Sequence, residues 1–137
     1  MRGVMLAIAI GLAGSGAGAQ DQPAAESAGT MMVFFDWGKP DPRGDDAATL
    51  DRAASAWRAN PEARLQLSGH TDRSGGASYN RLAARRRAEA VRNQLVERGV
   101  PMAAISIVPY GEARPLVPTE DGVREVQNRR VEIRIQE

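Results

Sequence analysis

A long apolar stripe within one predicted helix is the feature that most constrains how this chain of 137 residues can fold. The stripe consists of four residues spaced by four, three and four positions: Ala84, Ala88, Val91 and Leu95. This spacing places them on one face of a helix. The sequence predicts that helix over about residues 78–98, with Gly99 ending it. Because the stripe is aliphatic and partly alanine, the helix can pack closely on a sheet.

Four short segments predict the strands of that sheet. They are residues 31–35, the segment around Leu65 and Leu67, residues 103–110 and residues 131–135. The first is a continuous apolar run, which is typical of a buried strand. In the other three, apolar residues alternate with polar ones, which indicates strands with two different faces.

A second helix is predicted over residues 47–59, where apolar residues recur at helical spacing. Asp45 or Asp46 is expected to cap its start, because a carboxylate there can accept hydrogen bonds from the first backbone amides. Asn60-Pro61 is expected to stop it, since proline cannot continue a helix.

The resulting order is β-α-β-α-β-loop-β. Residues 111–127 form the loop, with a short helical turn expected near residues 122–126. This order predicts an α/β fold of the α+β sandwich type: a four-stranded mixed sheet with two helices packed on one face.

The first nineteen residues predict a signal peptide rather than part of this domain. Arg2 is followed by a short apolar run and then by Ala17-Gly18-Ala19, which has the form of a signal peptidase site. Residues 20–30 are expected to be a flexible segment, and residues 31–137 the folded domain. An uncleaved N-terminal anchor is the alternative, although the apolar run is short for spanning a bilayer.

Charge and cysteine content exclude several classes of function. The net charge is +1, and removal of Arg2 with the leader would leave 17 basic and 17 acidic residues, which disfavours nucleic acid as a partner. Without cysteine the chain cannot form disulfides or carry a lipid on cysteine, and with one histidine it is a poor candidate for a metal site. No cofactor is expected. We expect an exported periplasmic protein without a transmembrane segment after signal cleavage.

A carboxylate and a guanidinium are expected to lie close together where the second strand meets the long helix. Asp72 ends the segment Gly69-His70-Thr71-Asp72, and Arg87 lies on the helix that follows. Such a pair suits a zwitterion with an amino group and a carboxylate on one carbon. The carboxylate can hold the ammonium, and the guanidinium can bind the carboxylate through two parallel hydrogen bonds.

Helical phasing selects Arg87 from three consecutive arginines. At about 100° per residue, Arg86 falls opposite the apolar stripe and Arg85 about 90° to one side of it. Arg87 falls about 70° to the other side, at the edge of the stripe, where its stem can lie on apolar surface while its head reaches a loop. A structural salt bridge between Arg87 and Asp72 is the simpler interpretation, and it is compatible with ligand binding.

An ordered set of motifs resembles the OmpA-like peptidoglycan-binding domain over about residues 32–137. The matching pieces are Phe35-Asp36, Gly69-His70-Thr71-Asp72, Tyr79-Asn80, residues 87–91, Gly99-Val100, Tyr110-Gly111-Glu112, Arg114-Pro115 and residues 128–133. Two departures stand out. Leu82-Ala83 replaces a common Leu-Ser, and the loop over residues 37–42 is unusual.

The resemblance implies non-covalent binding of peptidoglycan through the diaminopimelate of its stem peptide, with a role in cell-envelope integrity and an envelope protein as a possible partner. The implied ligand-binding residues are Asp72, Arg87, Asn80, Thr71, Arg129 and Arg130, in a shallow site between the loop after the second strand and the start of the long helix. Of the last two, one is expected to line the site, and Arg130 is the one that could instead serve the fold.

Two other functions remain as alternatives. A hydrolytic triad could be drawn from His70, Asp72 and either Ser68 or Ser74, but the chain has no Gly-x-Ser-x-Gly elbow and His70 can simply brace its loop. We therefore do not expect an enzyme. The second alternative is a partner-binding or structural envelope module that has lost the ligand.

Overall fold

The computed structural model describes residues 30–137, so the predicted signal peptide and almost all of the predicted flexible segment lie outside the described residues. The strands are β1 (Thr30–Phe34), β2 (Arg64–His70), β3 (Ile105–Gly111) and β4 (Arg130–Gln136). The helices are α2 (Ala47–Ala59) and α3 (Ala77–Glu97), with short 3-10 helices η2 (Gly44–Asp46), η3 (Met102–Ala104) and η4 (Val126–Asn128). None of the helices within residues 30–137 combines the length and apolarity needed to cross a bilayer.

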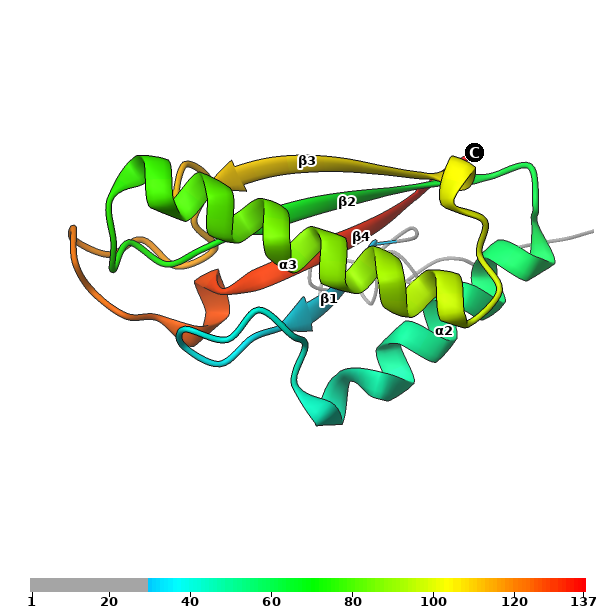
Figure 1. Ribbon diagram of the computed structural model, residues 1–137, viewed down its shortest axis with the longest axis horizontal. Helices are drawn as coiled ribbons and strands as arrows, with labels where there is room; N and C mark the ends of the chain where they lie inside the picture. The colour runs from blue at the N-terminus through cyan, green and yellow to red at the C-terminus, as the bar shows by residue number, and fades with distance from the viewer. Residues whose placement is uncertain (1–29) are drawn as a thin grey trace, which may run out of the picture.

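The four strands form one mixed sheet in the order β1-β4-β2-β3. β2 and β3 are parallel and are joined through α3, whereas β4 lies antiparallel to both β1 and β2. A parallel pair needs a crossover connection, and α3 provides it. This topology brings the loops after β1 and β2 to the same end of the sheet as the start of β4, as Figure 1 shows.

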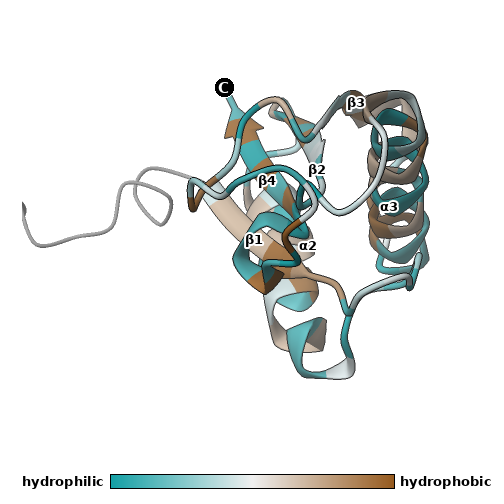
Figure 2. Ribbon diagram, turned by 90° about the vertical axis from the view of Figure 1, so that its left-hand side faces the viewer, coloured by the Kyte–Doolittle hydropathy of each residue, from teal (hydrophilic) through white to brown (hydrophobic). Residues whose placement is uncertain are grey.

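Both helices pack on the same face of the sheet, and the core lies between them and the strands. Figure 1 shows α3 running across the sheet with α2 beside it, and the side view of Figure 2 shows α3 standing to one side of the strands. The predicted stripe on α3 is fully buried: Ala84, Ala88, Val91 and Leu95. It meets inward-facing residues of the strands, among them Leu65, Leu67, Val131 and Ile133. The α/β sandwich expected from the sequence is therefore confirmed.

Most of the predicted element boundaries hold, and the exceptions have local causes. Gly99 ends α3 as expected, with a φ of 101° that favours glycine. The helical turn expected near residues 122–126 lies instead at η4, immediately before β4. Asp46 takes the N-cap position of α2 as expected, but its side chain makes no capping hydrogen bond. It accepts instead a hydrogen bond of 2.7 Å from the amide of Phe34, which ties its side chain to the end of β1.

Gly69 allows α3 to lie directly on β2. A Cβ atom built on Gly69 would collide with the backbone carbonyl of Ala84 on α3. Both residues are fully or nearly fully buried, so neither side can move without disturbing the core. The close approach fixes the depth at which the first half of α3 sits over the end of β2, where the candidate site begins.

We expect Gly69→Ala to destabilise the fold by about 1–3 kcal/mol, because the added methyl group must push α3 away from the sheet. Gly76→Ala is the matched control, since a Cβ there meets nothing within 4 Å. Urea unfolding of the two variants measures the difference. Equal stabilities would show that the backbone of α3 is not held at this distance.

Candidate ligand-binding site

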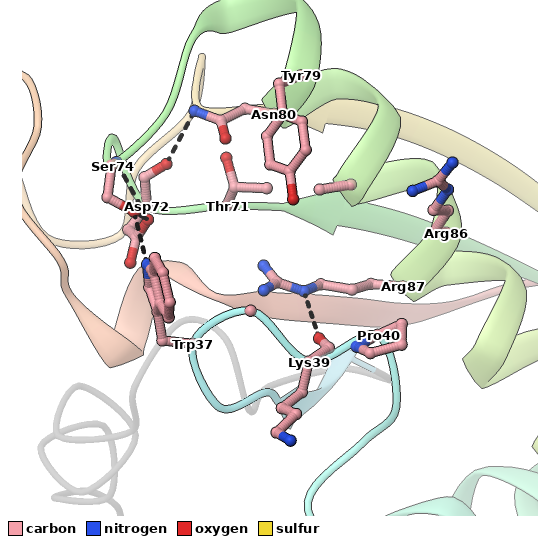
Figure 3. A pocket seen from close by; sticks show the side chains of 12 residues that line it. Trp37, Lys39, Pro40, Thr71, Asp72, Ser74, Tyr79, Asn80, Arg86 and Arg87 are labelled. Atoms are coloured by element: carbon pink, nitrogen blue, oxygen red, sulfur yellow. Dashed lines mark hydrogen bonds between the residues drawn. The ribbon is translucent and has the colours of Figure 1, made fainter.

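A pocket of about 200 Å³ opens where the loop after β1, the loop after β2 and the first half of α3 meet. Figure 3 shows its side chains converging from these three segments. Its lining residues are Trp37, Gly38, Lys39, Pro40, Thr71, Asp72, Ser74, Tyr79, Asn80, Ala83, Arg86 and Arg87. Four of the six predicted ligand-binding residues are thus brought together here: Thr71, Asp72, Asn80 and Arg87.

Asp72 lies at one side of the pocket, and both of its carboxylate oxygens accept hydrogen bonds. Oδ1 accepts hydrogen bonds from the amide of Ser74 at 3.2 Å and from its hydroxyl at 2.6 Å. Oδ2 accepts from the amide of Glu125 at 3.1 Å and from Nη1 of Arg129 at 2.8 Å. Two carboxylate oxygens offer about four lone-pair positions, so the hydrogen-bonding capacity of Asp72 is filled by the protein itself.

The surroundings of Asp72 keep it ionised. Burial acts to raise its pKa, but hydrogen bonds from Ser74, Arg129 and the amide of Glu125 together outweigh burial and leave the pKa below its usual range. Arg129 is itself buried and is held in place by a hydrogen bond of 3.0 Å from its Nε to the carbonyl of Phe35. The ion pair therefore sits in a site with little access to water.

Arg87 forms the opposite side of the pocket. It is only 6% exposed, and its Nε donates to the carbonyl of Lys39 at 3.3 Å. Its guanidinium carbon lies 5.3 Å from the centroid of the Phe35 ring. Burial and the neighbouring charge of Arg129 lower the pKa of Arg87 from its usual value. Within residues 30–137 its two terminal nitrogens have no hydrogen-bond acceptor, so they are free to bind an anion.

Asn80 and Thr71 complete the part of the site that the sequence predicted. The Asn80 amide bridges the carbonyl of Asp72 at 3.3 Å and the carboxylate of Glu112 at 2.7 Å, which joins α3 to the loops after β2 and β3. The Thr71 hydroxyl is buried and has no hydrogen-bond partner among the described residues. Asn80 therefore supports the loop, whereas Thr71 leaves a polar atom unsatisfied at the pocket.

Two expectations about the site need correction. Asp72 forms its ion pair with Arg129 and not with Arg87, because β4 brings Arg129 up against the end of β2. Arg129 reaches the pocket only through Asp72 and is not part of its lining. Arg130 lies outside the pocket lining, on the face of the sheet away from the helices, where it pairs with Glu132 at 2.8 Å. This placement fits the alternative that Arg130 serves the fold.

The phasing of the three arginines is confirmed, with one addition. Arg87 is buried, while Arg85 and Arg86 are exposed. Arg86 is nevertheless one of the residues that line the pocket, and Figure 3 shows it on α3 beyond Arg87. Arg85 is the arginine of this run that stays outside the pocket lining.

Sequence reasoning missed the wall that the loop after β1 contributes. Trp37 donates a hydrogen bond from Nε1 to the hydroxyl of Ser74 at 3.0 Å, and the guanidinium carbon of Arg124 lies 3.5 Å from the centroid of its ring. The side chain of Tyr79 stands on the opposite rim, 62% exposed. An exposed tryptophan in an unusual loop was the signal that could have pointed to this wall.

The residues proposed for a hydrolytic triad do not assemble. His70 points to the face of the sheet away from the helices, where its ring stacks on Tyr110 with centroids 5.4 Å apart. Neither of its ring nitrogens has a hydrogen-bond partner among the described residues, and Asp72 receives its four hydrogen bonds from other groups. His70 therefore neither activates a serine nor is oriented by Asp72.

Comparison with known proteins places this chain in a family. Residues 34–129 match the OmpA family. The match covers well over half of the chain, and we conclude that the chain belongs to the OmpA family.

Several members of known name are similar to the chain. A protein named outer membrane protein from Gluconacetobacter diazotrophicus is 42% identical over 110 residues, which are 76% of this chain but 29% of that protein. The peptidoglycan-associated lipoprotein of Pseudomonas putida is 36% identical over 124 residues, covering 88% of this chain and 74% of the relative. The chain thus spans less than a third of the first relative's length.

A solved structure has the same fold. The crystal structure of the peptidoglycan-associated lipoprotein from Burkholderia pseudomallei superposes with a TM-score of 0.71 at 30% identity, covering 77% of this chain and 89% of that one. The mixed four-stranded sheet with two helices is thus the fold of a known member of the family.

The buried ion pair should matter far more for stability than an exposed one. We expect Asp72→Ala to destabilise the fold by about 3–5 kcal/mol, because it leaves the charge of Arg129 buried without a partner. Asp51→Ala is the control, since its pair with Arg98 has the same length, 2.8 Å, but the Asp51 side chain is 68% exposed. That pair should contribute less than about 1 kcal/mol. Urea unfolding tests the contrast, and similar losses would contradict it.

His70 should make the fold sensitive to mild acid. Burial, and after it the charge of Arg130, lowers the pKa of His70 from 6.5 to about 4 against the opposing effect of Glu132. Between these values the unfolded chain binds a proton that the folded chain does not, so stability falls as the pH falls from 6.5 towards 4. From pH 7 to pH 5 the loss should be about 2 kcal/mol.

His70→Phe should remove most of this loss, because phenylalanine keeps the ring on Tyr110 but cannot titrate. Urea unfolding of both proteins at pH 7 and pH 5 provides the measurement. His70 is the only histidine in the sequence, so no second imidazole obscures the comparison. An unchanged loss in the variant would show that His70 is already charged in the folded protein.

Proposed function

We propose that this protein binds peptidoglycan non-covalently in the bacterial cell envelope, through the diaminopimelate of the stem peptide, and that it does so as a binding module without catalysis. Membership of the OmpA family supports the general role, as do relatives whose names associate them with peptidoglycan or the outer membrane. A periplasmic location and a contribution to envelope integrity belong to the same proposal.

The observation that carries the proposal is the guanidinium of Arg87. It is buried against Phe35, held by the carbonyl of Lys39, and has two terminal nitrogens that remain unused within residues 30–137. A planar guanidinium held in this way offers two parallel hydrogen bonds to a carboxylate. With Arg87 and Arg129 on either side of the single charge of Asp72, the site has an excess of positive charge that an anionic group can neutralise.

The pocket also suits the rest of a zwitterionic group. Asp72 provides a negative charge opposite Arg87, and the unpartnered hydroxyl of Thr71 provides a further polar contact. A volume of about 200 Å³ accommodates the end of one amino-acid side chain rather than a whole glycan repeat. These features favour the terminal amino-acid group of diaminopimelate, with the remainder of the stem peptide leaving through the open side.

Arg87→Ala should weaken binding of a diaminopimelate-containing stem peptide by roughly 10- to 150-fold, the equivalent of about 1.5–3 kcal/mol for a lost charge-assisted contact. Arg87→Lys should restore binding only in part, because lysine lacks the planar fork. Titration calorimetry with the purified protein gives the affinities, and co-sedimentation with insoluble peptidoglycan tests the same variants on the polymer.

Arg85→Ala is the matched control, because it removes the same charge from the same helix at a position outside the pocket lining. It should bind as the unchanged protein does. Equal weakening by Arg85→Ala would indicate attraction by overall charge. Equal sedimentation of all these proteins would favour the alternative of a structural or partner-binding envelope module.

A further inference from the structure

The hydroxyl of Ser74 lies between the pocket and the carboxylate of Asp72. Ser74 lines the pocket, and its hydroxyl donates to Oδ1 of Asp72 at 2.6 Å while accepting from Nε1 of Trp37 at 3.0 Å, as Figure 3 shows. The contact with Asp72 is the shortest of the four that the carboxylate receives. Ser74 thus donates two hydrogen bonds to Oδ1 of Asp72, one from its amide and one from its hydroxyl.

A ligand ammonium therefore meets a carboxylate whose acceptor positions are already filled. Three of the four donors are fixed: two are backbone amides, and the third is Arg129, which is buried and bonded to the carbonyl of Phe35. The fourth donor, the Ser74 hydroxyl, is the side-chain group of this set that belongs to the pocket wall. Direct contact with Asp72 would require a ligand to break at least one of these bonds.

The Ser74 hydroxyl offers a route that breaks none of them. A hydroxyl has one hydrogen to donate and two lone pairs to accept. Its hydrogen goes to Asp72 and one lone pair receives the indole N–H of Trp37, which leaves the second lone pair without a donor among the described residues. Two hydrogen bonds fix the rotation of the group, and the negative charge of Asp72 polarises it, so its oxygen is a good acceptor for an ammonium.

We propose that Ser74 is a specificity-determining residue that accepts a hydrogen bond from the ligand's ammonium group and links it to Asp72, and that Trp37 is the positioning residue that orients the Ser74 hydroxyl. This inference rests on the proposed function. It adds the residue that distinguishes a ligand with a free amino group from one whose amino group is acetylated. Arg124 stacks on the ring of Trp37 and holds the indole in the orientation that the hydrogen bond needs.

Two ligands separate this role from a purely structural one. The first is a stem tripeptide ending in diaminopimelate with a free amino group, and the second is the same tripeptide acetylated on that amino group. Titration calorimetry with the full chain gives the ratio of the two affinities. Ser74→Ala should reduce the preference for the free amine about tenfold or more and leave binding of the acetylated peptide nearly unchanged. Ser74→Thr, which keeps a hydroxyl, should retain most of the preference.

Trp37→Phe should reduce the same preference, and combining it with Ser74→Ala should add little, because the indole acts through the hydroxyl. Ser78→Ala is the control for serine removal, since Ser78 is exposed near the start of α3 and lies outside the pocket lining. Thermal unfolding of each variant confirms that it is folded at the temperature of the titration.

The outcomes keep this inference separate from the proposed function. If the unchanged protein binds neither peptide, the proposed function itself fails. If the unchanged protein binds through Arg87 but Ser74→Ala keeps the preference for the free amine, the role of Ser74 is refuted and the function stands. Tighter binding by Ser74→Ala would mean that the hydroxyl competes with the ligand. An equal loss of affinity for both peptides in Ser74→Ala would mean that Ser74 only supports the loop.

Discussion

The ion pair between Asp72 and Arg129 is the interaction on which the site depends. Arg129 immediately precedes β4 and Asp72 follows β2, so the pair closes one end of the sheet. Phe35, just after β1, makes two further hydrogen bonds with Arg129. Its backbone amide donates to the carbonyl of Arg129, and its carbonyl accepts from the Arg129 side chain. A buried pair is no guarantee of net stability, but removing one partner is costly because the other charge stays buried. Arg129 thus ties together the ends of β1, β2 and β4.

This arrangement separates the two charges that the sequence suggested would form a pair. Since Arg129 neutralises Asp72, Arg87 is left with a carbonyl and an aromatic ring as its protein contacts. Burial, and after it the nearby charge of Arg129, lowers the pKa of Arg87. The proposed ligand carboxylate would therefore meet Arg87 without breaking the ion pair between Asp72 and Arg129. Within residues 30–137 the pairing of Asp72 with Arg129 thus leaves Arg87 without an ion pair of its own, as the proposed ligand contact requires.

The features that could be predicted from the sequence are those that depend on local periodicity. Helical phasing placed Ala84 in the core and Arg87 at its edge, because both follow from the repeat of one helix. Helical phasing could not predict that Asp72 pairs with Arg129. The two residues are 57 positions apart in the sequence and are brought together by the antiparallel pairing of β2 with β4. Sequence reasoning also missed the wall formed by Trp37, because a loop with glycine and prolines has no period from which side-chain direction can be read.

The two ends of a bound zwitterion would meet groups that differ in their free hydrogen-bonding capacity. The carboxylate end would meet a guanidinium that is already oriented and whose terminal nitrogens have no acceptor within residues 30–137, so binding there would require little rearrangement. The ammonium end finds a carboxylate whose capacity is filled by Ser74, Glu125 and Arg129, so it interacts with the charge of Asp72 chiefly through the groups around it. Affinity should therefore come mainly from the Arg87 side. Discrimination between amines should come from the short polar contacts around Asp72, whose geometry the buried ion pair maintains.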